Sequence, residues 1–156
     1  MRVLSKEEFE QEKDIIRNKL KEENIVFIYP TDTIYGIGCS ALNKEAVQRI
    51  RKIKKRENNP FSVIAPSKEW IVKNCRLNEN AKEWLKKLPG PYTLVLKTKE
   101  ECVAKNVAPG LKTLGIRIPD HWFSGFAKEM NIPMLSTSAN ISGNDFMTSL
   151  EDLDER

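Results

Sequence analysis

The sequence contains only one histidine, His121, and only three cysteines among its 156 residues. A single histidine excludes a histidine-rich metal site, and it leaves serine–histidine hydrolase chemistry only if His121 is the base. Because His121 follows Pro119 and Asp120 at an expected helix start, we predict a capping or surface role for it. The cysteines are odd in number and widely spaced, which favours free thiols over a disulfide framework or a zinc site.

Long apolar runs are also missing. No segment approaches the roughly 20 apolar residues of a membrane-spanning helix, and residues 1–14 become charged too early for a signal peptide. Hydrophobic residues make up 40% and charged residues 31% of the chain, as in ordinary folded proteins. We therefore expect a single domain over residues 1–156, in the cytoplasm and without a membrane partner.

The positive charge is unevenly distributed, although the formal net charge is only +4. Residues 44–56, KEAVQRIRKIKKR, hold seven basic residues and one acidic residue, so this segment alone carries +6. This concentration of charge predicts an anionic partner, either nucleic acid or a polyphosphate.

Predicted strands and helices alternate along the chain, which indicates an α/β fold with a mixed, twisted sheet. We predict strands in segments 24–30, 61–65, 113–119 and 132–135, and residues 89–97 are predicted to form a turn that leads into a fifth strand. We predict helices that begin after Ser5, Asn43, Ser67 and Asn78 and at Asp120. Residues 148–156 predict the start of a further helix.

Residues 31–43, TDTIYGIGCSALN, are predicted to form a polar, glycine-containing turn region. The stretch from Gly36 to Ala41 fits the loose dinucleotide pattern G-x-G-x-x-[GA]. However, five residues separate Gly36 from the preceding strand, whereas that pattern needs its first glycine at the strand tip. A P-loop sequence does not occur, so neither nucleotide motif is adopted.

Two basic residues at the end of the basic helix are candidates for anion binding. Cations there also complement the helix dipole, which accounts for one or two of the charges. The flexible ammonium of Lys54 and the forked guanidinium of Arg56 together suit an oxyanion, and phosphate is the natural guest.

Arg117 lies inside an otherwise apolar strand, where an unpaired charge is costly. It should therefore meet an anionic ligand or form a structural ion pair, with Asp32 or Asp120 as the partner. Residues 136–140, STSAN, pose a similar choice, because they follow an apolar run and form either a solvated turn or cap, or a binding segment.

Six segments occur in the order and spacing of the YrdC-like family, the threonylcarbamoyl-AMP synthases that supply the tRNA modification t6A. The resemblance covers about residues 25–145, and its segments are YPTDTIYGIGCSA, Lys54-x-Arg56, Asn59-Pro60, PGPYTLVLK, GIRIPDH and STSANISG. It implies a twisted open mixed sheet with flanking helices and a concave basic face. It also implies a reaction of L-threonine, bicarbonate and ATP that gives threonylcarbamoyl-adenylate and pyrophosphate.

The resemblance implies roles for individual residues. Thr33, Arg117 and Ser136 correspond to L-threonine contacts. The nucleotide and phosphate contacts are Lys54, Arg56, Asn59, Thr113, Ser138 and Asn140. We expect Lys54, Arg56 and Mg²⁺ to stabilise the charge that develops at the α-phosphorus, with no direct protein ligand to the metal.

The chain resembles a short member of this family, because relatives usually continue past the Ser-x-Asn segment. We therefore expect a more open adenosine side, or a pocket that a partner or the second copy of a homodimer completes. A non-catalytic member, a module that binds double-stranded RNA or tRNA, and a carbamoyl-adenylate site of the hydrogenase-maturation type are the alternatives. For a synthase, the resemblance implies that t6A transferase proteins use the product, and that tRNA is a further partner.

Overall fold

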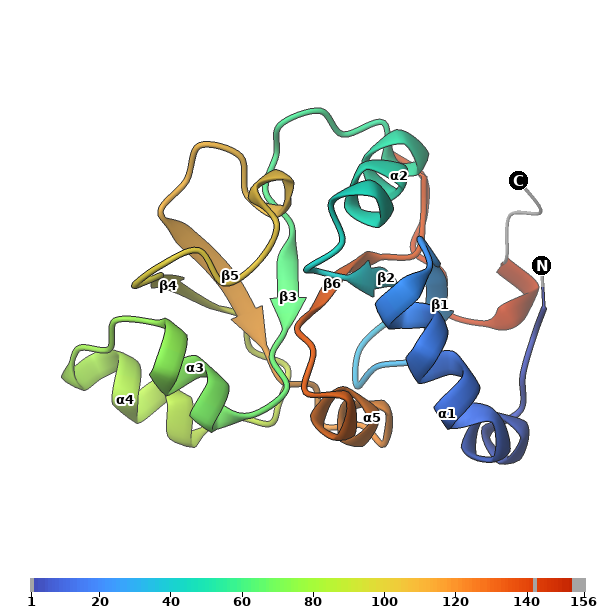
Figure 1. Cartoon of the computed structure of the whole chain (residues 1–156), viewed down its shortest axis with the longest axis horizontal. Coiled ribbons are helices and arrows are strands. Elements are labelled where there is room, and N and C mark those ends of the chain that lie inside the picture. The colour runs from blue at the N-terminus through green and yellow to red at the C-terminus, as the bar shows by residue number, and fades with distance from the viewer. Residues whose placement is uncertain (1, 142, 153–156) are drawn as a thin grey trace.

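The computed structural model describes residues 2–141 and 143–152. These residues form an open sheet in the strand order β1-β2-β6-β3-β5-β4 (Figure 1). The strands are β1 (Phe27–Tyr29), β2 (Gly36–Ser40), β3 (Ser62–Ile64), β4 (Leu94–Lys97), β5 (Thr113–Arg117) and β6 (Met134–Ser138). Within this part of the chain, β3 and β5 pair in parallel and the other neighbours pair antiparallel, so the predicted mixed, open α/β sheet is confirmed.

The α-helices are α1 (Lys6–Glu22), α2 (Lys44–Lys54), α3 (Lys68–Asn74), α4 (Glu79–Lys86) and α5 (Phe123–Met130). The predicted caps of the first four helices are confirmed, because Ser5, Asn43, Ser67 and Asn78 each accept a backbone N–H of the first turn. Short 3₁₀ turns cover Lys105–Val107 (η1) and Leu150–Asp152 (η2). The helix expected from residue 148 is only η2 within the described residues, and residues 153–156 lie outside them.

Alternating side chains along each strand divide the core between the two faces of the sheet. Val63 and Leu135 belong to the cluster packed under α2, α3 and α4. Their neighbours Ile64 and Met134 belong to the cluster packed under α1 and α5. Helices therefore cover both faces, and none of the described helices is long and apolar enough to cross a membrane.

The prediction of a turn over residues 36–40 is wrong, because this stretch is β2 and every residue in it is buried. The glycines are needed for space. A Cβ on Gly38 would lie 2.4 Å from the carbonyl oxygen of Leu135 and 3.0 Å from the ring of Tyr29. Gly36 is under the same ring, with a Cβ position 2.8 Å from it. Glycine here makes room for a buried tyrosine and does not turn the chain.

Two further boundaries differ from the prediction. Strand β6 runs beyond Leu135 to Ser138, because backbone pairing with β2 continues through the polar residues. Helix α5 begins at Phe123 and not, as predicted, at Asp120. Asp120 stays outside the helix, and its backbone N–H donates to Asp32. The role expected of His121 is confirmed, because its Nδ1 accepts the Phe123 N–H at 3.4 Å.

The space argument for Gly38 predicts that Gly38→Ala destabilises the fold by about 1–3 kcal/mol, the usual cost of overpacking a tight core. Gly125→Ala is the matched control, because Gly125 lies in α5 with nothing within 4 Å of its Cβ position. That control should be neutral or stabilising by about 0.5–1 kcal/mol. Urea unfolding of both variants measures the difference, and equal stabilities would contradict the argument.

Candidate functional site

Small residues form a row across the middle of the sheet. The register aligns Gly38 with Ser136, Ser136 with Ser62, and Ser62 with Gly115. By alternation these residues share the face that α1 and α5 cover near Met134 and Ile64. Of this row, Ser62 and Ser136 line a cavity, whereas the space over Gly38 is taken by the ring of Tyr29.

Two neighbouring cavities bear on function, and the larger of this pair, of about 570 Å³, is rich in cations and amides. Its lining comes from the end of α2, the following loop and the end of β6: Lys54, Lys55, Arg56, Glu57, Asn58, Asn59, Thr137, Ser138, Asn140 and Gly143. Three consecutive basic side chains and three amides match the needs of a polyphosphate.

The smaller cavity, of about 350 Å³, mixes hydroxyls with apolar side chains around Arg117. Its hydroxyls come from Thr31, Thr33, Tyr35, Ser62, Thr93, Ser136, Thr137 and Ser138, and its apolar walls from Ile34, Pro60, Phe61 and Phe146. The two cavities share Arg56, Thr137 and Ser138, so they adjoin at the Arg56 side chain.

Lys54 joins the end of α2 to the end of β6. Its ammonium is buried and donates to the carbonyl oxygens of Ser138 at 2.8 Å and Asn140 at 2.5 Å, and to Asn140 Oδ1 at 2.7 Å. Burial, aided by the nearby Arg56 charge, lowers the pKa of Lys54 to about 8, whereas the surrounding oxygens favour its protonated form. The amine therefore changes charge around pH 8.

Arg56 lies at the boundary between the cavities. Its Nη2 donates to the Pro60 carbonyl at 2.8 Å, and its guanidinium lies 4.9 Å from the centre of the Phe61 ring. Its buried Nε has no hydrogen-bond partner among the described residues, and burial lowers the pKa of the side chain. These contacts hold the guanidinium beside both cavities.

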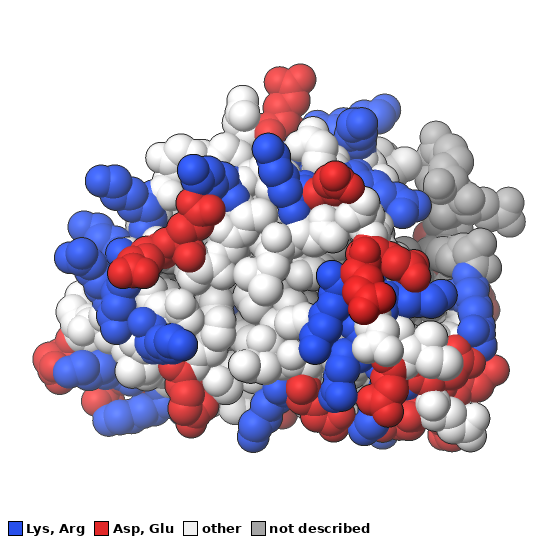
Figure 2. Space-filling model, in the orientation of Figure 1, with Lys and Arg blue, Asp and Glu red and all other residues white. Residues whose placement is uncertain are grey.

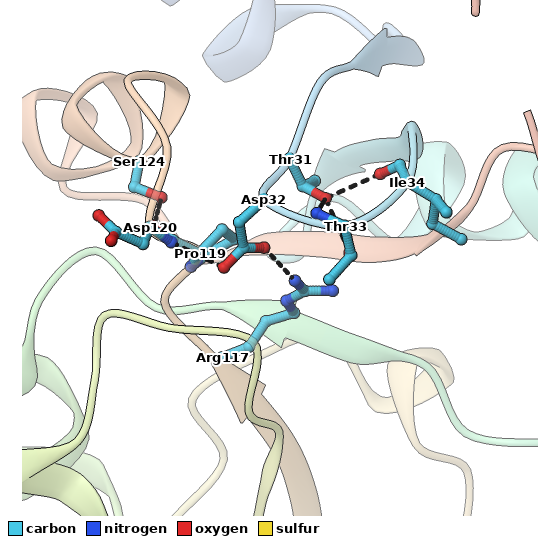
Figure 3. Close-up of polar contacts among 8 residues, drawn as sticks. All are labelled: Thr31, Asp32, Thr33, Ile34, Arg117, Pro119, Asp120 and Ser124. Carbon is cyan, nitrogen blue, oxygen red and sulfur yellow. Dashed lines mark hydrogen bonds and ion pairs between the residues drawn. The ribbon is translucent and has the colours of Figure 1, made fainter. Parts of the chain in front are cut away.

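Arg117 forms the ion pair that was one of its two predicted roles. Figure 3 shows its guanidinium facing Asp32, with 3.0 Å between Nη2 and Asp32 Oδ1. The other Asp32 oxygen accepts the Asp120 N–H at 2.9 Å. Arg117 also lines the smaller cavity, so the ion pair orients its guanidinium toward that cavity. A structural ion pair and contact with an anionic ligand are therefore compatible roles for Arg117.

The hydroxyl of Thr33 is directed by its neighbour Thr31. Thr31 Oγ1 donates its only hydrogen to the Ile34 carbonyl at 2.7 Å, and it lies 3.0 Å from Thr33 Oγ1 (Figure 3). Thr33 must therefore be the donor of that pair. The lone pairs of Thr33 Oγ1 stay available to accept a hydrogen bond from an ammonium or hydroxyl group in the smaller cavity.

The predicted contacts separate into the two cavities. All three residues expected to contact L-threonine, Thr33, Arg117 and Ser136, line the smaller one. The larger one contains five of the six expected nucleotide contacts: Lys54, Arg56, Asn59, Ser138 and Asn140. Thr113 lines neither cavity. It starts β5 opposite Lys97, on the same side of the strand as Arg117, and its nucleotide contact stays a prediction.

Sequence reasoning missed Arg51 and Ser62. Ser62 lines the smaller cavity within a short buried strand, where only the alternation of small and large residues could have marked it. Arg51 was predicted only as one charge of a basic helix, yet it is 4% exposed. Arg51 lies one residue after Ile50 and four after Val47, and this spacing next to the apolar face of the helix could have indicated that Arg51 is buried.

The family model for Sua5/YciO/YrdC, described as telomere recombination, matches residues 18–156. A Methanocaldococcus jannaschii protein is 39% identical over 94% of this chain and 70% of its own length. A Bacillus subtilis threonylcarbamoyl-AMP synthase is 37% identical over 88% of this chain but only 42% of its own. The crystal structure of Pyrococcus abyssi Sua5 complexed with L-threonine superposes with a TM-score of 0.81, at 32% identity over 97% of this chain and 44% of that one.

The Lys54 geometry predicts a pH-dependent affinity for anions in the larger cavity. Inorganic pyrophosphate should bind more weakly as the pH rises through about 8, because the free protein then loses the ammonium proton. Above that pH the affinity should fall about tenfold per unit, until the pKa of the bound state is reached. Titration calorimetry between pH 7 and 9.5 measures the slope, and a flat profile would contradict a role for the Lys54 charge.

Proposed function

Because the chain belongs to the Sua5/YciO/YrdC family, we propose that it is a threonylcarbamoyl-AMP synthase that condenses L-threonine, bicarbonate and ATP. The observation that carries the proposal is the pair of adjoining cavities, one basic and one lined by hydroxyls around Arg117. A relative of this chain has been crystallised with L-threonine, which supports an amino acid as one ligand. The chain spans about two fifths of the length of that relative and of the Bacillus enzyme. The activity of those longer proteins is therefore a proposal for this chain.

The amino acid fits the smaller cavity by charge and polarity. Its carboxylate would pair with the Arg117 guanidinium, which Asp32 already holds in place. A buried hydroxyl partner distinguishes threonine from analogues that lack its hydroxyl, and Thr33 and Ser136 are the candidates. The amine would then point toward the junction of the two cavities at Arg56.

The chemistry needs two bond-forming steps at that junction. The amine of threonine adds to bicarbonate with loss of water, which gives an anionic N-carboxythreonine. A carbamate oxygen then attacks the α-phosphorus of ATP, and the bond to pyrophosphate breaks. Arg56 and Lys54 would stabilise the charge on the phosphoryl oxygens, and holding the reactants side by side would supply further acceleration. The carbamate is already a nucleophile, so a general base is not required.

Mg²⁺ would enter with the nucleotide and neutralise charge on its phosphates. Among residues 2–141 and 143–152, no group of three acidic, cysteine or histidine side chains is placed to hold a metal. Mg²⁺ commonly keeps several waters and binds through substrate phosphates. Glu57 is the acidic side chain in the lining of the larger cavity, and it would contact the ion through a water.

We favour the enzyme over the RNA-binding alternative because of how charge is arranged. Figure 2 shows Lys and Arg around most of the outline of one face, on the right and below as well as on the left and along the upper edge, with Asp and Glu among them. Nucleic-acid affinity needs cations that act together along a surface. In this protein three consecutive basic side chains, Lys54, Lys55 and Arg56, lie together in the lining of one cavity, beside the amides of Asn58, Asn59 and Asn140. The product would serve t6A synthesis through further transferase proteins that act on tRNA in the cytoplasm.

The activity test is pyrophosphate release from ATP and Mg²⁺ by the purified protein. We expect release only when L-threonine and bicarbonate are both present, and much less with L-serine. The same samples should contain threonylcarbamoyl-adenylate, which mass spectrometry detects. ATP binding without release would indicate a non-catalytic member. Absence of ATP binding, together with salt-sensitive binding of RNA, would favour the RNA-binding alternative.

Arg56→Ala should lower threonine-dependent turnover by about 10²–10³-fold, because an oriented charge at the reacting phosphate is lost. Arg49→Ala is the matched control, since it removes one exposed guanidinium from α2 that is not part of either cavity. The control should retain the activity, and both variants should keep the circular dichroism of the parent. A folded Arg56→Ala protein with full turnover would remove Arg56 from the proposed mechanism.

A further inference from the structure

Arg51 is a buried cation behind the wall of the larger cavity. It projects from α2 with only 4% of its surface exposed, and it does not line either cavity. Its guanidinium lies 4.6 Å from the centre of the Phe61 ring, which is also the ring against which Arg56 lies. Helix α2 therefore places a second arginine directly behind the one at the cavity junction.

The guanidinium is bonded entirely to backbone carbonyls. Nε donates to Asn106 at 2.8 Å, and Nη2 donates to Val107 at 3.3 Å. Nη1 lies within hydrogen-bond distance of three carbonyl oxygens of the loop after α2, those of Arg56 at 3.0 Å, Glu57 at 2.9 Å and Asn59 at 3.1 Å. No carboxylate lies within ion-pair distance of Arg51 in the described part of the chain.

These contacts set the shape of one cavity wall. Residues 56–59 carry no regular secondary structure, and their carbonyls would otherwise turn toward water or toward the cavity. Because Arg51 collects three of these oxygens on the far side, the side chains of the loop face the cavity instead. Carbonyl oxygens are also kept away from an anionic guest, which they would repel.

We propose that Arg51 is a positioning residue that holds the loop of residues 56–59 in the shape that binds a polyphosphate. It acts through the loop and through its own uncompensated charge, without touching the ligand. The inference rests on the proposed function only in that the larger cavity takes the phosphates of a nucleotide. A guanidinium satisfied by carbonyls, in place of a carboxylate, keeps its positive charge available to that cavity.

The alternative is that Arg51 only fills space in the core next to Phe61. In that case its replacement would lower stability and would affect all ligands to the same extent. Positioning of the loop has a different signature, because the smaller cavity is built mainly from other segments. Phosphate affinity should fall while L-threonine affinity stays unchanged.

The test measures binding of inorganic pyrophosphate and of L-threonine by calorimetry, in the full chain and in three variants. Arg51→Met removes the charge and the donors, and Arg51→Lys keeps the charge but loses the fork. Lys52→Met is the matched control, an exposed charge removed from the same helix. We expect the Kd for pyrophosphate to rise by about tenfold or more for Arg51→Met and by a smaller factor for Arg51→Lys. Lys52→Met should change it less than about twofold.

The outcomes separate the inference from the proposed function. Unchanged pyrophosphate affinity in either folded Arg51 variant overturns the positioning role, as does an equal loss of affinity for both ligands. Should Arg51→Met not fold, Arg51→Lys decides by the same criteria. A parent protein that binds no pyrophosphate overturns the inference, whereas the synthase is judged separately by threonine-dependent pyrophosphate release. Selective loss in the Arg51 variants, in a protein that binds both ligands without turnover, supports the inference and overturns only the enzyme.

Discussion

The buried Lys54 ammonium is the contact on which the site depends, because it ties the end of α2 to the end of β6. Its hydrogen bonds to Ser138 and Asn140 fix the polar end of a central strand beside the basic loop that follows the helix. The larger cavity lies between these two segments. A charged group also has to be desolvated for this purpose, which is reflected in a pKa lowered to about 8. The tie is therefore structural and electrostatic at once.

Strand β6 explains why one face of the sheet is both core and binding surface. On one face of the sheet its side chains change from Met134, which is packed under α1 and α5, to Ser136 and Ser138, which line the smaller cavity. The backbone ladder with β2 continues through that change, so the polar side chains project from the same hydrogen-bonded strand as the apolar ones. Rigid placement on a strand suits a site that must align two ligands.

How far the sequence predicts this structure depends on the range of the interactions. Caps such as Ser5 and Asn43 are local, and their prediction was confirmed. The strand at Gly38 was missed, because the need for glycine there comes from close packing against Tyr29 and the Leu135 carbonyl, which the residues around Gly38 do not reveal. The family resemblance assigned the candidate contacts to two ligands, but it did not indicate that they line two adjoining cavities with Arg56 and Ser138 in both. Arg51 could not be assigned from residue types, since its partners are backbone carbonyls, two of them more than fifty residues away.

A crystal structure with L-threonine and an ATP analogue that cannot be cleaved between the α- and β-phosphorus tests the central claim most directly. Both ligands should be present in one complex, with the threonine carboxylate on Arg117 and the phosphates beside Lys54 and Arg56. The amine of threonine and the α-phosphorus should then face each other across the Arg56 side chain, with room for a carboxyl group between them. Ligands that exclude one another, or that bind outside the two cavities, would contradict the account.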